Sequence, residues 1–440
     1  MNILKFLFIF IILQHCSFDN KSGIWQNEND KQKKDNVFKD FKKLSTTKDF
    51  FNEKIEIENN YLIDLSKNIV NKQWKDIYYN YSNNFENFKY ENLNKLTFKS
   101  KKFSRYNIDK YKLYENGNLI FSDNGGSLFI FSIKEKRIIR KFNFYKNKFK
   151  KIRKKINFLV ANNIIFVSDN LGYLYAIDYK KDKVIWAKNY KIPFRSNLKL
   201  YQNTLIAANQ NNSLFFFNKN NGDLLKKIPT EETLIKNEFI NNLSISENNL
   251  FFLNTYGSLY SININLMSVE WFININQSLD LNPSNLFIGK EIINYKGNLV
   301  TSSNNFTYIF DEKSGSLLYK KNFISSVKPI LNNSHLFLIT KNNFLICLSL
   351  KNKEIVYSYD INQKIAEFLN LKKKRVEPQS FFLVNNKIFT FLKNNYLVIF
   401  NINGELEEVR KLPSKIYSIP IFINNSIFYL DQKNRLLVLN

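Results

Sequence analysis

The chain has 440 residues, of which 44% are hydrophobic, 16% aromatic and 23% charged. This composition is near the globular norm and excludes disorder over the whole chain, and the length suits one very large domain or two or three ordinary ones. Two cysteines exclude a disulfide framework, and two histidines leave little for histidine-based metal sites or catalysis.

The charge is strongly basic, with 65 Lys and Arg against 38 acidic residues and a formal net charge of +27. Only 8 of the basic residues are Arg, whereas Asn occurs 69 times. Lys, Asn, Ile and Phe share codons rich in A and T, so we interpret the excess as genome composition spread over a solvated surface. A nucleic-acid site concentrates Arg and Lys on one element, and we therefore expect no nucleic-acid partner. A basic surface near anionic lipid is the remaining alternative.

Residues 1–15 have the pattern of a secretory signal peptide. Lys5 precedes an unbroken apolar run at 6–13. This run is too short to span a bilayer, which needs about 20 residues. One basic residue followed by a short apolar segment therefore predicts export.

The next residues, Leu13-Gln14-His15-Cys16, resemble a bacterial lipobox, with His15 where a small residue is usual. The resemblance implies cleavage before Cys16 and a diacylglyceryl group on its thiol. Ser17 after the cysteine implies delivery to the outer membrane. The alternative is an ordinary secretory peptide cleaved nearby, with Cys16 incidental.

Residues 16–91 differ from the rest of the chain, and we predict a lipidated N-terminus, a polar tether and a weakly helical segment. The stretch 26–43 is almost entirely polar and cannot bury enough apolar surface to become ordered. The stretch 53–77 has weak helical apolar spacing. We expect Trp74 to be a packing anchor on the rim of the following domain.

Residues 92–440 contain a repeat of short apolar strands and tight turns. The repeats align on anchor positions spaced 38 to 52 residues apart: Leu128, Leu174, Leu214, Leu259, Thr307, Leu345, Leu397 and Leu436. Two residues before each anchor stands Gly or Asn: Gly126, Gly172, Asn212, Gly257, Asn305, Asn343, Asn395 and Asn434. Both residue types tolerate a positive φ, so each marks a two-strand turn.

The period and the strand pattern predict an all-β fold, an eight-bladed β-propeller of four-stranded antiparallel blades. A solenoid is the alternative. An aromatic residue recurs twelve positions after four of the anchors: Trp186, Trp271, Tyr319 and Tyr357. The last repeat lacks an outer strand, and residues 93–103 resemble one, so we expect this N-terminal strand to close the ring and remove an open sheet edge.

Few residues in the sequence suggest catalysis. We expect Cys347 to be a core residue and His335 to lie in a surface loop. Asp178 and Asp311 occupy repeat turns, which explains them without a catalytic role. No nucleophile motif, phosphate loop or spaced set of metal ligands is present, so we expect no catalytic, cofactor-binding or metal-binding residues.

The repeat Gly172-Tyr173-Leu174-Tyr175-Ala176-Ile177-Asp178, ending in Trp186, resembles that of pyrroloquinoline-quinone enzymes. This resemblance implies an eight-bladed propeller in which the Trp staples neighbouring blades. Those enzymes also use an adjacent Cys pair, a calcium site and a catalytic Asp. The sequence has no adjacent Cys pair and no acidic cluster that marks a calcium cage.

The lipobox-like start, the tether and the propeller together resemble the BamB family, the lipoprotein subunit of the machinery that assembles outer-membrane β-barrels. The resemblance implies a non-enzymatic scaffold, a monomer within a complex, held by its lipid at the periplasmic face of the outer membrane. Its implied partner is a periplasmic domain of the BamA-like barrel-assembly protein. The alternatives are a quinone-dependent dehydrogenase and a propeller that binds cell-envelope polysaccharide.

Three links between repeats are candidate surfaces. In residues 192–198, Phe194 and Arg195 resemble the Leu-Arg pair that contacts the barrel-assembly protein in the BamB family, which implies partner binding by these two residues. Alternatively, Phe194 caps a blade edge and Arg195 is solvated. The basic links 146–155 and 372–375 are interpreted as solvated loops; if functional, they would meet acidic lipid or an acidic partner surface.

Overall fold

A computed structural model describes residues 16–18, 25–27, 51–91, 93–145, 149–233, 238–276, 287, 289–303 and 306–440. Residues from Phe50 to Asn440 form one compact unit, and Met1–Asp49 form a separate unit. In the N-terminal unit, the backbone of β1 (Cys16–Phe18) pairs antiparallel with that of β2 (Trp25–Asn27). The predicted signal peptide and most of the predicted tether lie outside the described residues.

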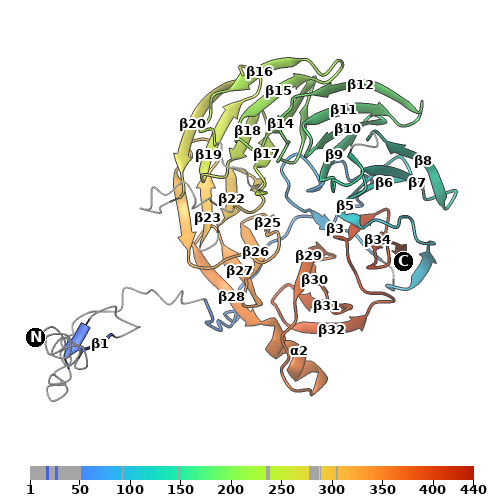
Figure 1. The fold of residues 1–440 in the computed structure, drawn as a ribbon. Helices are drawn as coiled ribbons and strands as arrows, with labels where there is room; N and C mark the ends of the chain where they lie inside the picture. The colour runs from blue at the N-terminus through green and yellow to red at the C-terminus, as the bar shows by residue number, and fades with distance from the viewer. Residues whose placement is uncertain are drawn as a thin grey trace, which may run out of the picture. The chain divides into compact units, whose positions relative to one another are not determined.

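The compact unit is a ring of eight blades around a central axis, which confirms the predicted fold (Figure 1). Each blade is a four-stranded antiparallel sheet. From the innermost strand outwards, blade 1 consists of β5 (Ile108–Glu115), β6 (Asn118–Asp123), β7 (Ser127–Ser132) and β8 (Arg137–Asn143), and blade 2 of β9 (Ile156–Ala161), β10 (Ile164–Asp169), β11 (Tyr173–Asp178) and β12 (Lys183–Asn189). Blade 3 consists of β13 (Lys199–Tyr201), β14 (Thr204–Ala208), β15 (Leu214–Asn218) and β16 (Leu224–Ile228), and blade 4 of β17 (Asn242–Ser246), β18 (Asn249–Leu253), β19 (Ser258–Asn263) and β20 (Ser268–Asn274).

The second half of the ring follows the same order. Blade 5 consists of β21 (Ile293–Tyr295), β22 (Asn298–Ser302), β23 (Thr307–Asp311) and β24 (Leu317–Lys321), and blade 6 of β25 (Ile330–Asn332), β26 (His335–Ile339), β27 (Phe344–Ser349) and β28 (Glu354–Asp360). Blade 7 contains β29 (Pro378–Val384), β30 (Lys387–Leu392), β31 (Tyr396–Asn401) and β32 (Leu406–Lys411), and blade 8 consists of β33 (Ile421–Ile423), β34 (Ser426–Leu430), β35 (Leu436–Leu439) and β4 (Leu96–Lys99). Blade 7 gains a fifth strand, because β3 (Asn87–Phe88) pairs parallel with β29.

The turns form where the Gly and Asn positions predict them. All seven of these residues that the structure describes have a positive φ, from 59° at Asn434 to 93° at Gly126; Asn305 lies outside the described residues. Each anchor residue lies in the third strand of its blade, where it is buried. Asp178 and Asp311 accept backbone hydrogen bonds within their turns, as expected.

The ring closes through the predicted N-terminal strand. Strand β4 pairs antiparallel with β35, with Phe98 opposite Val438 and Lys99 opposite Leu437. Blade 8 therefore combines segments from both ends of the compact unit. Its outer edge is completed by β4, as the resemblance of residues 93–103 to an outer strand predicts.

Tryptophan side chains staple neighbouring blades. Trp186 in blade 2 donates its indole N–H to the carbonyl of Lys219 in blade 3 at 2.8 Å. Its ring lies so close to Gly222 that a Cβ there would approach the ring to 2.5 Å. Trp271 makes the same bond to Glu312 of the next blade at 3.2 Å. These contacts confirm the role that the repeat resemblance implies.

Helix α2 (Ile361–Leu369) joins blade 6 to blade 7 and is the one helix in the part of the chain that the structure describes. The expected weak helix at 53–77 is wrong: this stretch contains no helix, and it makes isolated bridges with the blades. Among the described residues, no helix has both the length and the apolar character needed to cross a membrane.

Candidate functional site: the plugged channel and its rim

Residues 66–91, here called the plug, occupy the centre of the ring (Figure 1). The plug makes backbone or side-chain hydrogen bonds to the innermost strand of every blade. In the order of blades 1 to 8, the paired residues are Trp74–Tyr114, Lys75–Val160, Asp76–Lys199, Tyr81–Ile245, Ser82–Asn294, Asn84–Leu331, Asn87–Leu383 and Asn71–Phe422; Asn87 and Leu383 are register partners in the hydrogen-bonded strands β3 and β29. One short segment therefore ties all eight blades to a common axis.

Aromatic side chains of the plug fill the channel. Trp74, which is 2% exposed, lies 4.7 Å from the ring of Tyr79 and 5.5 Å from that of Phe85. Phe85 contacts Phe382 of blade 7 at 4.7 Å between ring centroids. Trp74 is thus a packing anchor, as expected, but its expected position on the rim is wrong, because the whole segment enters the channel.

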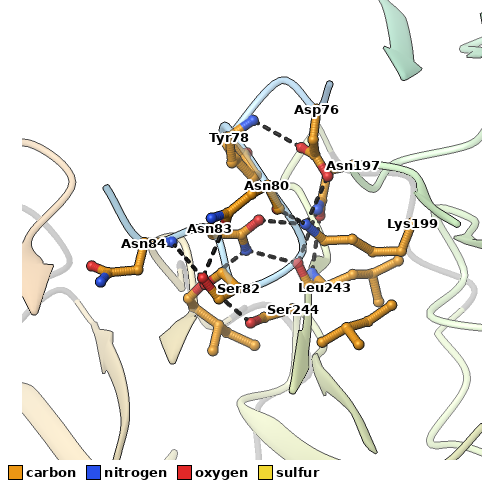
Figure 2. A network of polar contacts seen from close by, with 12 residues as sticks. Asp76, Tyr78, Asn80, Ser82, Asn83, Asn84, Asn197, Lys199, Leu243 and Ser244 are labelled. Carbon is orange, nitrogen blue, oxygen red and sulfur yellow. Dashed lines mark hydrogen bonds and ion pairs between the residues drawn. The ribbon is translucent and has the colours of Figure 1, made fainter. Parts of the chain in front are cut away.

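A buried ion pair holds the plug to blade 3 (Figure 2). The amine of Lys199 lies 2.7 Å from a carboxylate oxygen of Asp76. It also donates to the carbonyl of Asn80 at 2.8 Å and to the side-chain oxygen of Asn83 at 2.6 Å. Burial lowers the pKa of Lys199, and Asp76 opposes this shift. With three oxygen acceptors, the buried ammonium is fully hydrogen bonded.

Asparagine side chains extend the network to three further blades. Asn83 donates to the carbonyls of Leu243 at 2.8 Å and Ile292 at 2.7 Å. Asn197 from blade 3 donates to the same Leu243 carbonyl at 2.9 Å, as Figure 2 shows. Asn84 both donates to the backbone of Leu331 and accepts from it. The carboxamides thereby satisfy buried backbone groups of the innermost strands, where no further strand could pair.

One end of the channel is a cavity of about 370 Å³, here called the funnel. Plug residues line it on one side, among them Trp74 and Phe85, and the links between blades form its rim. Two lysines line it, the buried Lys112 and the half-buried Lys328, and burial lowers the pKa of each well below the usual value. Protein acceptors hold both amines: Lys112 donates to the hydroxyl of Ser418 at 2.9 Å, and Lys328 to two plug carbonyls at 2.7 and 2.9 Å.

The described residues offer no metal site in or near the funnel. No group of three or more His, Cys, Asp or Glu side chains there could hold a metal ion. Cys347 is fully buried, as predicted, and burial raises the pKa of its thiol well above the usual value. The expectation for His335 is wrong: it is 3% exposed, in β26, with Nε2 3.1 Å from the hydroxyl of Tyr61.

The link between blades 2 and 3 is pinned to three blades. The N–H of Phe194 donates to Asp169 of blade 2 at 3.0 Å, and the N–H of Arg195 donates to Ala208 of blade 3 at 3.0 Å. The carbonyl of Arg195 accepts from Asn241, which leads into blade 4, at 2.7 Å. The backbone of this link is therefore rigidly placed on the same face as the funnel rim.

Phe194 and Arg195 differ sharply in exposure. Phe194 is 1% exposed and packs edge-on against Tyr190 and Phe217. An interface anchor must be exposed, so the expectation that Phe194 is an exposed apolar residue is wrong. Arg195 is partly exposed, and burial lowers its pKa while the nearby Glu238 opposes the shift. The structure thus supports the edge-capping alternative for Phe194 and leaves Arg195 at the surface.

Ile240 is the rim residue that the sequence analysis missed. It is 44% exposed, it lines the funnel, and its neighbour Asn241 is bonded to Arg195. The exposed apolar side chain beside Arg195 therefore comes from the next link, 45 residues later in the sequence (240 minus 195). Glu238 in that link pairs with Lys155 at 2.8 Å. We call Arg195, Glu238 and Ile240 the rim patch.

The remaining candidates from the sequence are Cys16 and the two basic links. The side chain of Cys16 lies outside the described residues. In the first basic link, 146–148 are also outside them, and Lys150 and Lys151 are exposed. The second basic link, 372–375, is exposed throughout and follows α2.

Comparison with known proteins agrees with the fold. The model of a family described as outer membrane protein assembly factor BamB matches residues 145–359. The structure resembles BamB from Moraxella catarrhalis with a TM-score of 0.61 and 10% identity, covering 79% of this chain and 99% of that one. No curated protein matches the sequence.

Quinone enzymes share the same architecture. The quinohemoprotein alcohol dehydrogenase from Comamonas testosteroni matches with a TM-score of 0.61 and 9% identity, over 83% of this chain and 80% of that one. A europium-containing methanol dehydrogenase matches with a TM-score of 0.58 and 13% identity, over 83% and 89%. At these identities the likeness concerns the fold alone. Residues 145–359 thus match the model of the BamB family by their sequence, and the compact unit is an eight-bladed propeller of the PQQ-like repeat type.

Proposed function

We propose that this protein is a non-catalytic scaffold of the machinery that assembles outer-membrane β-barrels. It holds a periplasmic domain of the barrel-assembly protein on the face that carries the rim patch. The observation that carries the proposal is the rim patch itself, an arginine on a hydrogen-bonded link beside an exposed isoleucine from the next link of a BamB-type propeller. Arg beside an apolar side chain is a frequent centre of interface energy.

The anchor in this proposal is the lipid on Cys16. The acyl chains hold the propeller at the periplasmic face of the outer membrane, and the polar residues 26–43 serve as the tether. A single copy of the chain is enough to form the complete propeller, because strands from the same chain close the ring in blade 8.

The plug favours a scaffold over a quinone enzyme. A planar cofactor on the propeller axis needs an open bed and free polar groups. In this chain, plug rings occupy the axis, and Lys112 and Lys328 are held by protein acceptors. A quinone dehydrogenase is the second candidate, because such enzymes share the fold. Dye reduction after addition of the quinone and calcium would reveal that activity.

The test is co-purification of the barrel-assembly protein with variants of the rim patch. Arg195→Glu reverses a contact charge and Ile240→Ser removes exposed apolar surface, so we expect each to reduce recovery of the partner strongly. Removing the arginine of a buried interfacial charge pair costs about 2 to 5 kcal/mol of binding free energy, partly because the carboxylate is left unpaired. Phe194→Ala acts differently, since this ring is buried: it lowers stability.

Matched controls lie on outer strands. Arg140→Glu in β8 reverses the same charge, and Leu317→Ser in β24 removes a similar apolar side chain, both at exposed sites on outer strands. Thermal melts check that every variant folds. If Arg195→Glu and Ile240→Ser both retain the partner at the control level, the rim patch is not the interface.

A further inference from the structure

Helix α2 and the basic residues after it form a convex projection from the propeller, here called the α2 protrusion (residues 361–375; Figure 1). Asp360 caps the start of the helix, accepting from the N–H of Asn362 at 2.8 Å. The base is closed by Asn362, whose side-chain oxygen accepts from the N–H of Val376 at 2.8 Å. The protrusion is thus a fixed loop with both ends anchored between blades 6 and 7.

Its tip exposes large apolar side chains. Phe368 is 46% exposed, Leu369 40% and Leu371 64%. The buried residues of the helix are Ile361, Asn362 and Ala366. The exposed Phe368, Leu369 and Leu371 are therefore not among the residues that bury this helix against the propeller. Exposed clusters of large apolar side chains on a protein surface mark contact with a partner or a membrane.

Four consecutive cations follow the tip at 372–375. Lys373 pairs with Asp360 at 2.6 Å. Among the described residues, Lys372 and Lys374 make no ion pair within 4.0 Å, and both are exposed. The protrusion therefore presents apolar side chains next to uncompensated positive charge. This is the chemistry of segments that lie at the interface of an anionic bilayer.

The N-terminal end of the compact unit lies beside the base of the protrusion. Ile55 exchanges two backbone hydrogen bonds with Ser358, at 3.0 and 2.9 Å. Ser358 is in β28, two residues before the cap Asp360. The chain that leads from Cys16 thus joins the propeller next to α2.

We propose that the α2 protrusion is a membrane-docking element that binds an anionic phospholipid surface. Phe368, Leu369 and Leu371 enter the boundary between headgroups and acyl chains, and Lys372 and Lys374 contact lipid phosphates. Large apolar side chains directly beside unpaired lysines suit the boundary of an anionic bilayer, where the apolar groups are buried and the ammonium groups reach the phosphates. This contact is independent of the lipid on Cys16 and of the rim patch.

The test uses the mature chain with Cys16→Ser, which carries no lipid, in flotation with vesicles. We expect it to bind vesicles of phosphatidylethanolamine with about a third phosphatidylglycerol, and to bind phosphatidylcholine vesicles weakly. Phe368→Ser with Leu371→Ser, and separately Lys372→Glu with Lys374→Glu, should each lower the partition coefficient at least about tenfold. Added salt should weaken binding of the parent chain.

The chain offers a control with similar residue types on an outer strand, where Lys227 is paired with Glu232. Leu224 and Leu225 in β16 are 46% and 48% exposed and precede Lys226 and Lys227. Leu224→Ser with Leu225→Ser, and Lys226→Glu with Lys227→Glu, should leave the partition coefficient within about twofold of the parent. Equal losses from the control and α2 variants would show diffuse attraction of a basic protein and overturn the proposal.

A dye reports insertion directly. In the Cys16→Ser background the other cysteine, Cys347, is fully buried, so Leu371→Cys can be labelled selectively with an environment-sensitive fluorophore. Anionic vesicles should shift its emission to shorter wavelengths. No shift together with no flotation overturns membrane docking, and leaves partner binding at Arg195 and lipidation of Cys16 to be judged by their own experiments.

Discussion

The indole ring of Trp186 in blade 2 packs against Gly222 and donates a hydrogen bond to Lys219, both in blade 3. We expect Trp186→Ala to lower the free energy of unfolding by about 3 to 5 kcal/mol, because it leaves a void between blades 2 and 3. It also removes the hydrogen bond to the Lys219 carbonyl. Leu225→Ala, on an exposed strand nearby, should change stability by less than about 0.5 kcal/mol. Urea denaturation measures both, and similar losses would mean that Trp186 is not a staple.

His335 should make stability depend on pH. Burial lowers its pKa below the usual 6.5, with the nearby Asp64 opposing the shift. As pH falls through 6.5, the unfolded chain binds a proton before the folded one does, so the free energy of unfolding falls. His335→Gln should therefore show a smaller loss of melting temperature between pH 7.5 and 5.5 than the parent. An unchanged loss would mean that His335 does not titrate as its burial implies.

Single residues show where sequence reasoning succeeds and where it stops. Positive φ at the turn positions was predictable, because each repeat needs the same turn and only Gly or Asn takes it readily. The burial of Phe194 and His335 was not, since each is covered by side chains distant in sequence, such as Phe217 and Tyr61. Ile240 was missed for the same reason: its neighbour Arg195 belongs to another link.

At the scale of elements, the plug depends on its buried ion pair. Lys199→Met leaves the Asp76 carboxylate buried without its cation, and we expect it to destabilise the fold by about 3 to 5 kcal/mol. The double variant Asp76→Asn with Lys199→Met removes both charges and should lose clearly less than Lys199→Met alone. Chemical denaturation of both variants provides the measurement.

An exposed pair supplies the comparison. Lys373→Met breaks the bond to Asp360 at a site where both side chains reach solvent, and should change stability by less than about 1 kcal/mol. Equal effects of Lys199→Met and Lys373→Met would show that the plug is not held by its ion pair.

The plug could not be foreseen as an element. Its residues follow no repeat, and the apolar spacing at 53–77, which includes its first part, indicated a weak helix, whereas the chain has no helix there. A non-helical path is favoured because several backbone groups of the plug find partners on innermost strands, such as Trp74 with Tyr114 in blade 1 and Tyr81 with Ile245 in blade 4. The strands were predictable for the opposite reason, since eight copies of one pattern reinforce each other.

For the whole molecule, the proposed lipid anchor and the α2 protrusion make separable contributions to membrane attachment. We expect the parent protein to stay with membranes in high salt, because acyl chains bind independently of charge. Cys16→Ser combined with Arg195→Glu should be released into the soluble fraction by high salt, since the lipid and the rim-patch contact are removed and only the electrostatically assisted contact of the α2 protrusion remains. Fractionation of envelopes at low and high salt measures this. Release of both proteins alike at high salt would contradict lipidation of Cys16.

The closure of blade 8 sets the order in which the molecule can fold. Thr97 in β4 contacts Val438, a partner 341 residues away. As synthesis proceeds from the N-terminus, the plug emerges before any of its eight partners, and β4 waits for the last strand. Pairing over such distances is slow. A nascent chain halted before Leu436 would keep a gap with two open sheet edges, which invite aggregation and proteolysis. A protease or chaperone that binds open sheet edges would therefore distinguish a chain without β35 from one whose ring is closed.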